Sequence, residues 1–381
     1  MVDAHDAGSS PQAAQEKAQA PEKALEQAPA PADGQGAAEK AAAPSGRGRT
    51  TKGPTIYDVA RAAGVAPSTV SRAFSRPGRV NAETSERVRR VAEEIGYRTQ
   101  PVTRPANSAR TSLIGLVIAD VTNPFFFDIT RGLQDEAAER DYTLILLDSR
   151  ESDVKERESI ERTLPMVEGI VLASSRMSDT AIRVMAKQKP LVMVNRVVSD
   201  VPSVVPDNPR GIRRALELLG SQGHERVTYL AGPEASWADG MRWRAMREGG
   251  MELDLVVRRV GPLVPTVSGG IAAVKAWEER PTSAVVAYND LVAIGFIRAL
   301  EVHGYRVPDD VSVVGFDNIF ASDLVSPALT TVATPRRALG ATAVRHLELG
   351  IRGQVKRTAP TVLPIKLMER RTTARKQGDL P

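Results

Sequence analysis

The 381-residue sequence contains no cysteine, so a disulfide framework and a thiolate metal site are both excluded. This absence fits a reducing compartment, and we expect a cytoplasmic protein. The four histidines, His5, His224, His303 and His346, lie far apart and lack the spacing of metal ligands. No run of about 18 apolar residues occurs, and the N-terminus lacks a basic stretch followed by an apolar one. We therefore expect no metal site, membrane span or signal peptide.

Motifs that carry catalysis are also missing. The sequence shows no Ser/His/Asp constellation and no paired-carboxylate motif. The segment GPEAS at 232–236 has one glycine and no lysine, so it is not a phosphate-binding P-loop. We expect no enzyme and no cofactor.

Charge is distributed unevenly along the chain. Residues 1–44 hold three Lys and seven Asp/Glu, whereas residues 45–111 hold thirteen Lys/Arg and five Asp/Glu, a local net charge of +8. A basic segment of this kind attracts phosphates and speeds the encounter with DNA. Residues 1–52 have almost no large apolar side chain, and we expect them to form a disordered Ala/Pro-rich tail.

The basic segment carries the pattern of a helix-turn-helix domain over residues 53–100. Apolar residues at Ile56, Val59, Ala60 and Ala63 recur at helical spacing, and Gly64 supplies the left-handed residue that ends the first helix. A second helix begins at Pro67 and turns Val70 and Phe74 inward. A third helix is capped by Asn81 and ends at Gly96.

The second helix leaves a polar face outward, which is how a recognition helix meets a DNA groove. Arg72 can bind a guanine edge or a phosphate, and Ser68 can bond to a base edge. Thr69 and Ser71 suit phosphate oxygens. The predicted contacts in this domain are Tyr57, Arg61, Pro67, Ser68, Thr69, Ser71 and Arg72. The alternative is a small solvated three-helix unit whose arginines face water.

A different pattern begins at residue 112, after a linker at 101–111. Apolar segments at 113–118, 143–147, 169–173, 191–195, 226–231, 283–287 and 311–316 alternate with amphipathic helical stretches such as 129–140, 210–219 and 291–303. This alternation predicts an α/β core with parallel sheets. The repetition is long enough for two such sheets.

Polar residues follow the predicted strands, where ligands of open α/β sheets bind. Carboxylates, amides and an arginine near aromatic rings suit a polyhydroxylated ligand. The predicted ligand-binding residues are Asp120, Asn123, Phe126, Asn195, Ser236, Trp237, Arg242, Asp290 and Asp317.

Plainer interpretations remain for several of these positions. Asn123 and Asp290 could each only cap a helix, and Asp317 could brace a loop. Phe125 fits the core better than a pocket, and Arg196 could form an inter-strand ion pair.

The sequence resembles the lactose-repressor (LacI/GalR) family of transcriptional regulators. The resemblance is carried by TIYDVARAAGVAPSTVSRAFS, then GYR, IGLVIADVTNPFF, LAGPEAS, AYNDLVAIG, VSVVGFDN and LTTV, from Thr55 to the C-terminus. It implies an all-α headpiece, a hinge, and a two-subdomain core like a periplasmic sugar-binding protein. Subdomain 1 would span about 112–207 plus 334–362, and subdomain 2 about 208–333 plus 363–374. By this resemblance Asn195, Arg242 and Asp290 fall at effector-contacting positions.

Two departures from the family pattern limit what carries over. The run Ala66-Pro67-Ser68 gives short reach into the major groove, so the operator sequence does not transfer from relatives. Ala106 stands where the family inserts a leucine into the minor groove, beside Pro105. We expect weaker kinking, or a hinge that reads DNA with Arg104 and Asn107.

These features predict a sequence-specific DNA-binding transcriptional regulator, and we expect it to act as a repressor. Its expected partners are a near-palindromic DNA operator, a small effector (a sugar or a nucleoside) and a second copy, with dimer or tetramer left open. The alternatives are a ligand-free architectural DNA-binding protein and a solute-sensing module with incidental DNA affinity.

Overall fold

The computed structural model describes residues 54–75, 78, 80–97, 111–354 and 359–377. The chain divides into two units, residues 1–103 and 104–381, and each is described by itself. The predicted tail at 1–52 and the hinge residues Arg104, Ala106 and Asn107 lie outside the described residues.

The described residues of the first unit form three helices, α1 (Ile56–Ala63), α2 (Pro67–Ser75) and α3 (Ala82–Glu94). The Thr55 backbone N–H donates to the Asp58 carboxylate at 2.9 Å and fixes the start of α1. Gly64 ends α1 with a φ of 67°, a left-handed conformation that glycine adopts without strain. The Asn81 side chain accepts from the Glu83 N–H at 3.1 Å and starts α3. The helical spacing in the sequence located all three helices.

Buried residues from all three helices form a small core. Val59, Val70, Ala73 and Val88 are fully buried. The Phe74 ring lies 6.1 Å from the Tyr97 ring and closes one side of this core. The inward face of α2 therefore packs in the core, and its opposite face is exposed to solvent.

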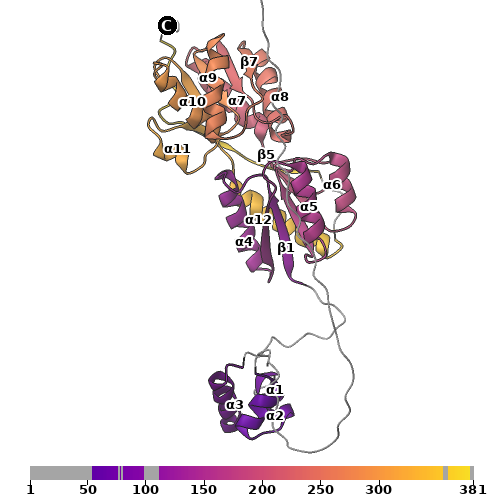
Figure 1. The fold of residues 1–381 in the computed structure, drawn as a ribbon. Helices are drawn as coiled ribbons and strands as arrows, with labels where there is room; N and C mark the ends of the chain where they lie inside the picture. The colour runs from indigo at the N-terminus through magenta and orange to yellow at the C-terminus, as the bar shows by residue number, and fades with distance from the viewer. Residues whose placement is uncertain (1–53, 76–77, 79, 98–110, 355–358, 378–381) are drawn as a thin grey trace, which may run out of the picture. The chain divides into compact units, whose positions relative to one another are not determined.

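The second unit holds two six-stranded sheets (Figure 1). The order in the first sheet is β11 (Thr361–Leu363), β5 (Ser203–Pro206), β4 (Leu191–Val194), β3 (Gly169–Ala173), β1 (Leu113–Ile118) and β2 (Thr143–Asp148), all parallel. The helices of this half are α4 (Phe125–Ala138), α5 (Asp153–Thr163), α6 (Asp179–Ala186) and α12 (Arg336–Ile351). We call this half subdomain 1.

The second sheet has the order β12 (Lys366–Met368), β10 (Thr330–Ala333), β9 (Ser312–Asp317), β8 (Ala284–Ala287), β6 (Arg226–Leu230) and β7 (Val256–Val260). Its helices are α7 (Asn208–Ser221), α8 (Trp237–Glu252), α9 (Val267–Glu278), α10 (Asp290–Val302) and the short α11 (Ala321–Leu324). We call this half subdomain 2. The expectation of parallel sheets holds except at the edge, where β12 pairs antiparallel with β10.

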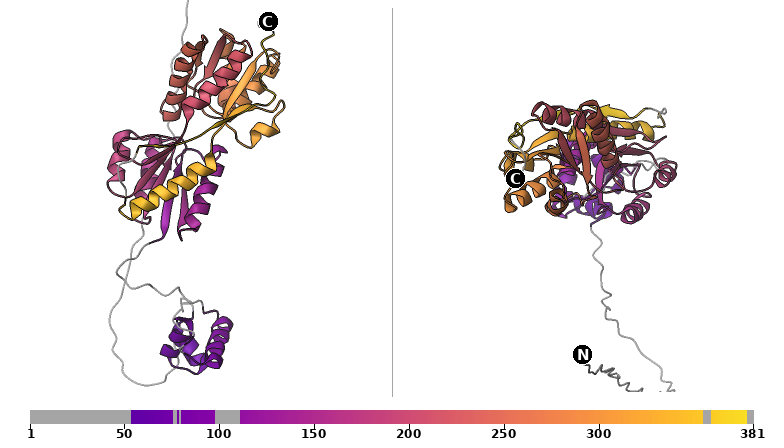
Figure 2. Two further views of the ribbon diagram at one scale, coloured as in Figure 1. Left: turned by 180° about the vertical axis from the view of Figure 1, so that it is seen from behind. Right: turned by 90° about the horizontal axis from the view of Figure 1, so that it is seen from above.

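The chain passes between the two subdomains three times, after β5, after β10 and between β11 and β12. Figure 2 shows α12, which follows the second crossing, lying along α4 of subdomain 1. Because β11 pairs with β5 and β12 pairs with β10, each crossing leaves one of the strands at one edge of its sheet.

Glycines allow two helix pairs to approach closely, one pair in each subdomain. A Cβ on Gly132 of α4 would lie 2.0 Å from the Arg337 carbonyl of α12. A Cβ on Gly295 of α10 would lie 2.0 Å from the Val267 carbonyl of α9. No side chain fits at either crossing, so these helices pack backbone against backbone.

Candidate nucleic-acid interface and ligand pocket

The outer face of α2 presents a polar surface. Pro67, Ser68, Ser71 and Arg72 are exposed, and Thr69 is half-buried. On α1, the Tyr57 side chain is exposed, and Arg61 is exposed with its guanidinium 3.8 Å from Asp58. The structure therefore places the predicted contacts of α1 and α2 at the surface, outside the small core. Their binding of DNA stays a prediction at the level of single residues.

A narrow pocket lies between the two subdomains, beyond the carboxyl ends of β1, β3, β4, β8 and β9. Its cavity volume is only about 20 Å³, enough for little more than one water molecule. Of the predicted ligand-binding residues, five line this pocket: Asn123, Phe126, Asn195, Arg242 and Asp317. Phe125, assigned to the core from sequence, is buried and also borders the pocket.

Arg242 is the most extensively bonded of these residues. Its side chain is 2% exposed. The Nε atom donates to the Asn208 side chain at 3.1 Å, one Nη donates to the Tyr288 carbonyl, and the other faces Asp317 at 3.4 Å. The guanidinium also lies 3.6 Å from the centre of the Phe316 ring. Arg242 thus ties α8 to the ends of β8 and β9 and forms one wall of the pocket.

Asp317 sits at the end of β9 with a φ of 108°, a left-handed conformation that costs strain in a non-glycine residue. Burial raises the pKa of Asp317 to about 7, although Arg242 partly opposes the rise. Near neutral pH this carboxyl group can both donate and accept, which suits the hydroxyl of a ligand.

Four predicted ligand-binding residues do not line the pocket. Asp120 accepts from the Thr122 N–H at 2.8 Å and stabilises its own turn. Ser236 caps α8 and bonds to the Tyr288 hydroxyl at 3.0 Å, and Trp237 begins that helix half-buried.

The carboxylate of Asp290 is the clearest departure from the sequence interpretation. It is fully buried and accepts from the Ile319 N–H at 2.8 Å, from the Ser322 hydroxyl at 2.7 Å and from the Thr331 hydroxyl. Its oxygens are therefore used inside subdomain 2. The geometry supports a bracing role and does not bring Asp290 to a ligand.

The pocket also contains polar residues outside the predicted ligand-binding set, namely Glu151, Ser174, Arg176, Tyr288 and Asn289. Arg176 donates through Nε to Glu151 at 2.6 Å and is 6% exposed. Ser174 follows β3 as directly as Asn195 follows β4, and Arg176 comes two residues later, so the rule that selects residues after parallel strands also indicates this loop.

Asn195 and Arg196 illustrate two different roles at the end of β4. Asn195 donates to Ser174 at 2.9 Å, and its Oδ1 is buried without a hydrogen-bond partner in the described part of the chain. That oxygen faces a pocket and can accept from a ligand hydroxyl. Arg196 instead pairs with Asp179 at 2.6 Å and donates to the carbonyls of Ser175 and Met177, so it holds the loop after β3.

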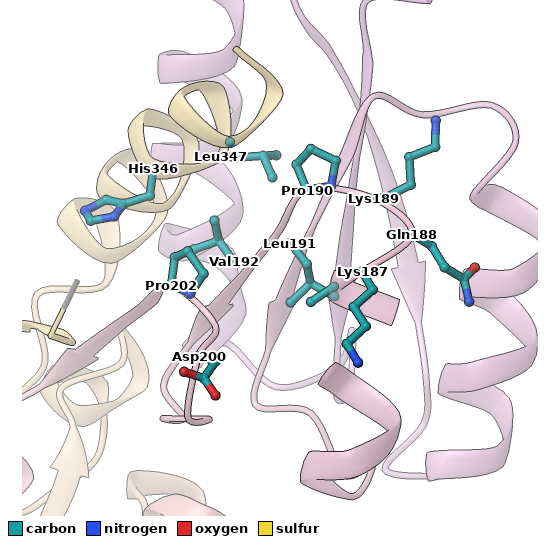
Figure 3. A pocket seen from close by; sticks show the side chains of 12 residues that line it. Lys187, Gln188, Lys189, Pro190, Leu191, Val192, Asp200, Pro202, His346 and Leu347 are labelled. Atoms are coloured by element: carbon teal, nitrogen blue, oxygen red, sulfur yellow. The ribbon is translucent and has the colours of Figure 1, made fainter. Parts of the chain in front are cut away.

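A larger cavity, of about 330 Å³, lies at the opposite end of β4 (Figure 3). Apolar Pro190, Leu191 and Leu347 line it together with Lys187 and Lys189. None of the predicted ligand-binding residues lines it. Over the described ranges, no cluster of metal-ligating residues occurs and no helix is long and apolar enough to cross a membrane.

Comparison with family models gives two matches. Residues 55–100 match bacterial regulatory proteins of the lacI family, and residues 216–373 match the periplasmic binding protein-like domain. The transcriptional regulator DegA of Bacillus subtilis is 31% identical, over 84% of this chain and 98% of its own length.

Two solved structures extend the likeness. The lac repressor dimer bound to operator and an anti-inducer is 26% identical, with a TM-score of 0.73, over 85% of this chain and all of that one. A regulator of the same family from Enterococcus faecalis with bound ribose is 30% identical, with a TM-score of 0.63, over 70% of this chain and all of that one. The expected fold, a helix-turn-helix headpiece before a two-subdomain core, is confirmed.

Proposed function

Because the chain belongs to the lacI family of bacterial regulatory proteins, we propose that it represses transcription at an operator under the control of a sugar. The sugar sits between the two core subdomains and sets the affinity of the headpiece for DNA. The protein acts in the cytoplasm and catalyses no reaction.

On the DNA side, the exposed face of α2 supports this proposal. Ser68 and Arg72 are exposed on a helix whose other face is packed, so they can enter a major groove without unfolding the domain. The polar side chains that precede Arg72 on α2 are short and reach less far into a groove. We therefore assign most of the base discrimination to Arg72. Thr69 and Ser71 bond to phosphates and set the register.

On the effector side, the chemistry of the pocket supports a polyhydroxylated ligand, which the volume of about 20 Å³ admits only when the two subdomains move apart. Asn195 offers an unpartnered buried acceptor, Arg242 offers a fixed guanidinium, and Asp317 can donate or accept. The Phe126 ring gives an apolar wall. The ribose bound to the Enterococcus faecalis regulator is the same class of ligand.

The protein binds DNA as a homodimer, as the lac repressor structure does. Two headpieces read two half-sites about one helical turn apart, so a small reorientation of the cores changes affinity. The operator is accordingly a near-palindrome.

The observation that carries this proposal is the polar, exposed face of α2 in a headpiece whose sequence matches the lacI family model. Selection from a random pool of DNA duplexes by the full-length protein tests it. We expect one near-palindromic sequence to be enriched, and its affinity to fall by orders of magnitude with rising salt. Binding to all duplexes alike would instead favour an architectural DNA-binding protein, and no binding at all would favour a solute sensor.

A further inference from the structure

We propose that Arg176 makes this an acidic-sugar sensor: its guanidinium recognises a carboxylate or phosphate group carried by the effector. This inference rests on the proposed function, because it names the class of ligand for the same pocket. Arg176 lies in the loop after β3, in subdomain 1.

Hydrogen bonds with two buried side chains hold the backbone of the loop that carries Arg176. The Arg176 backbone N–H donates to the buried Glu156 carboxylate at 2.9 Å. The two neighbouring carbonyls, of Ser175 and Met177, accept from the buried Arg196 guanidinium at 2.8 Å and 2.6 Å. Two buried charged residues therefore hold the backbone of one residue in place. Such preorganisation costs desolvation of both groups, and it places the Arg176 side chain in the pocket with little freedom to leave it.

The guanidinium of Arg176 lies in the pocket between the subdomains. It donates to Glu151 of subdomain 1 at 2.6 Å, and Tyr288, which follows β8 in subdomain 2, lines the same pocket. Burial alone would lower the pKa of Arg176, but Tyr288 and Glu151 raise it above its usual value, so the side chain stays cationic.

The two partners in this ion pair differ in their access to water. The Arg176 side chain is 6% exposed, whereas the Glu151 side chain is 27% exposed. Glu151 can turn toward solvent, while Arg176 cannot escape the pocket. When Glu151 turns away, the buried cation needs another anion, and a ligand carboxylate or phosphate fits the guanidinium fork with two parallel hydrogen bonds.

The other arginine of the pocket is not available in this way. Arg242 already donates to Asn208, Tyr288 and Asp317, and these acceptors come from rigid elements of its own subdomain. Its role is to hold the wall of the pocket and bond to neutral hydroxyls. Arg176 is therefore the cation that selects ligand charge.

Pairs of sugars that differ only in carrying an acidic group test this proposal. Glucose, galactose and mannose are compared with their uronates and their 6-phosphates, by calorimetric titration of the full-length protein. We expect at least one acidic sugar to bind about tenfold or more tightly than its parent, because the anion pairs with a desolvated guanidinium. The uronates and the 6-phosphates show which anion the pocket accepts.

Two variants of the pocket sharpen the test. Arg176→Met should reduce the preference for the acidic sugar to about twofold or less, and Glu151→Gln should increase it by removing the competing carboxylate. Arg150→Met is the matched control. Arg150 lies next to Glu151 and its loss changes the net charge equally, but its side chain is 75% exposed, so the preference should persist. Unfolding midpoints without ligand show whether each variant is folded.

Tighter binding of the neutral parents, or a preference for acidic sugars that survives Arg176→Met, would overturn this inference and leave the proposed function intact. A protein that binds its operator but none of the nine sugars would overturn the effector half of the proposed function as well. Should Arg176→Met fail to fold, Glu151→Gln alone decides: an unchanged preference overturns the proposal.

Discussion

Arginine is used in opposite ways in the two units of this chain. In the headpiece, Arg61 and Arg72 stand in water on the outer faces of two short helices. In the core, Arg176 and Arg242 are almost fully buried and hold acceptors at hydrogen-bonding distance. A solvated cation can exchange its water for a DNA phosphate or base, whereas an unpaired buried cation is strongly destabilising. Mutation should therefore separate the two groups: changes to headpiece arginines should alter DNA binding, and changes to core arginines should alter stability and ligand choice.

The largest effect is expected from Arg242→Met. The change removes the guanidinium from three acceptors and leaves a buried carboxylate at Asp317 without its partner, which should cost about 3–5 kcal/mol of unfolding free energy. Urea unfolding followed by tryptophan fluorescence measures it, because Trp237, Trp243 and Trp277 all belong to the core. Arg244→Met, on the same helix but 70% exposed, should cost under about 0.5 kcal/mol. Equal losses in the two variants would break the comparison.

The next effect is expected where α9 and α10 pack closely at Gly295. Gly295→Ala would place a Cβ 2.0 Å from the Val267 carbonyl and force α9 and α10 apart, at a cost of about 1–3 kcal/mol. Gly240→Ala, on α8, meets nothing within 4 Å and should stabilise by about 0.5–1 kcal/mol. The same unfolding measurement applies to both. A neutral result at Gly295 would show that this helix pair is not locked as described.

On the headpiece side, Arg72→Ala should weaken operator binding by about 1–3 kcal/mol and blur the preference at one base position. Fluorescence anisotropy on the selected duplex and its single-base variants measures this. Core stability should not change, since Arg72 contributes nothing to the buried core of either unit. Arg90→Ala, an exposed change on α3, is the matched control for loss of charge. Unaltered affinity and unaltered preference in Arg72→Ala would remove α2 from its assigned role.

The last effect is a pH dependence at Asp317, spread over several pH units. Its pKa is about 7 in the folded chain and near 3.8 when unfolded, so the folded state binds the extra proton between about pH 4 and pH 7. This group therefore makes the wild type less stable as pH rises through that range. Asp317→Asn lacks the contribution, so its stability relative to wild type should rise from pH 5 to pH 7 and level off above about pH 8. Paired unfolding curves that stay parallel across this range would contradict the raised pKa.

Much of the fold could be predicted because burial leaves a simple pattern. The segments at Leu113–Ile118 and Gly169–Ala173 are fully apolar central strands, and their sequence limits match the structure. The strand Val256–Val260 escaped notice because Arg258 and Arg259 interrupt it, as an edge strand allows. The helix α4 begins at Phe125, four residues before the expected start; Pro124 is its N-cap, and the Asn123 side chain accepts from the Phe125 N–H at 3.0 Å.

The pocket was predicted less completely than the fold. The carboxyl ends of the strands predict its location, and Asn123, Asn195 and Arg242 line the pocket found there; their contact with a ligand stays a prediction. The sequence does not show which carboxylate lines the pocket and which braces the fold, because Asp290 and Asp317 both follow strands. Their difference lies in Ser322 and Thr331, which satisfy Asp290 from 32 and 41 residues away in sequence.

The central claim is that α2 lies in a DNA groove, and the absence of native cysteine makes it directly testable. A single Ser68→Cys variant, labelled with an iron chelate that cleaves nearby DNA, would be bound to the selected duplex. The same label at Glu93→Cys, an exposed position on α3, is the control. We predict cleavage confined to each half-site from position 68 and little or none from position 93. Equal cleavage from both positions, or none from position 68 on a bound duplex, would contradict the account.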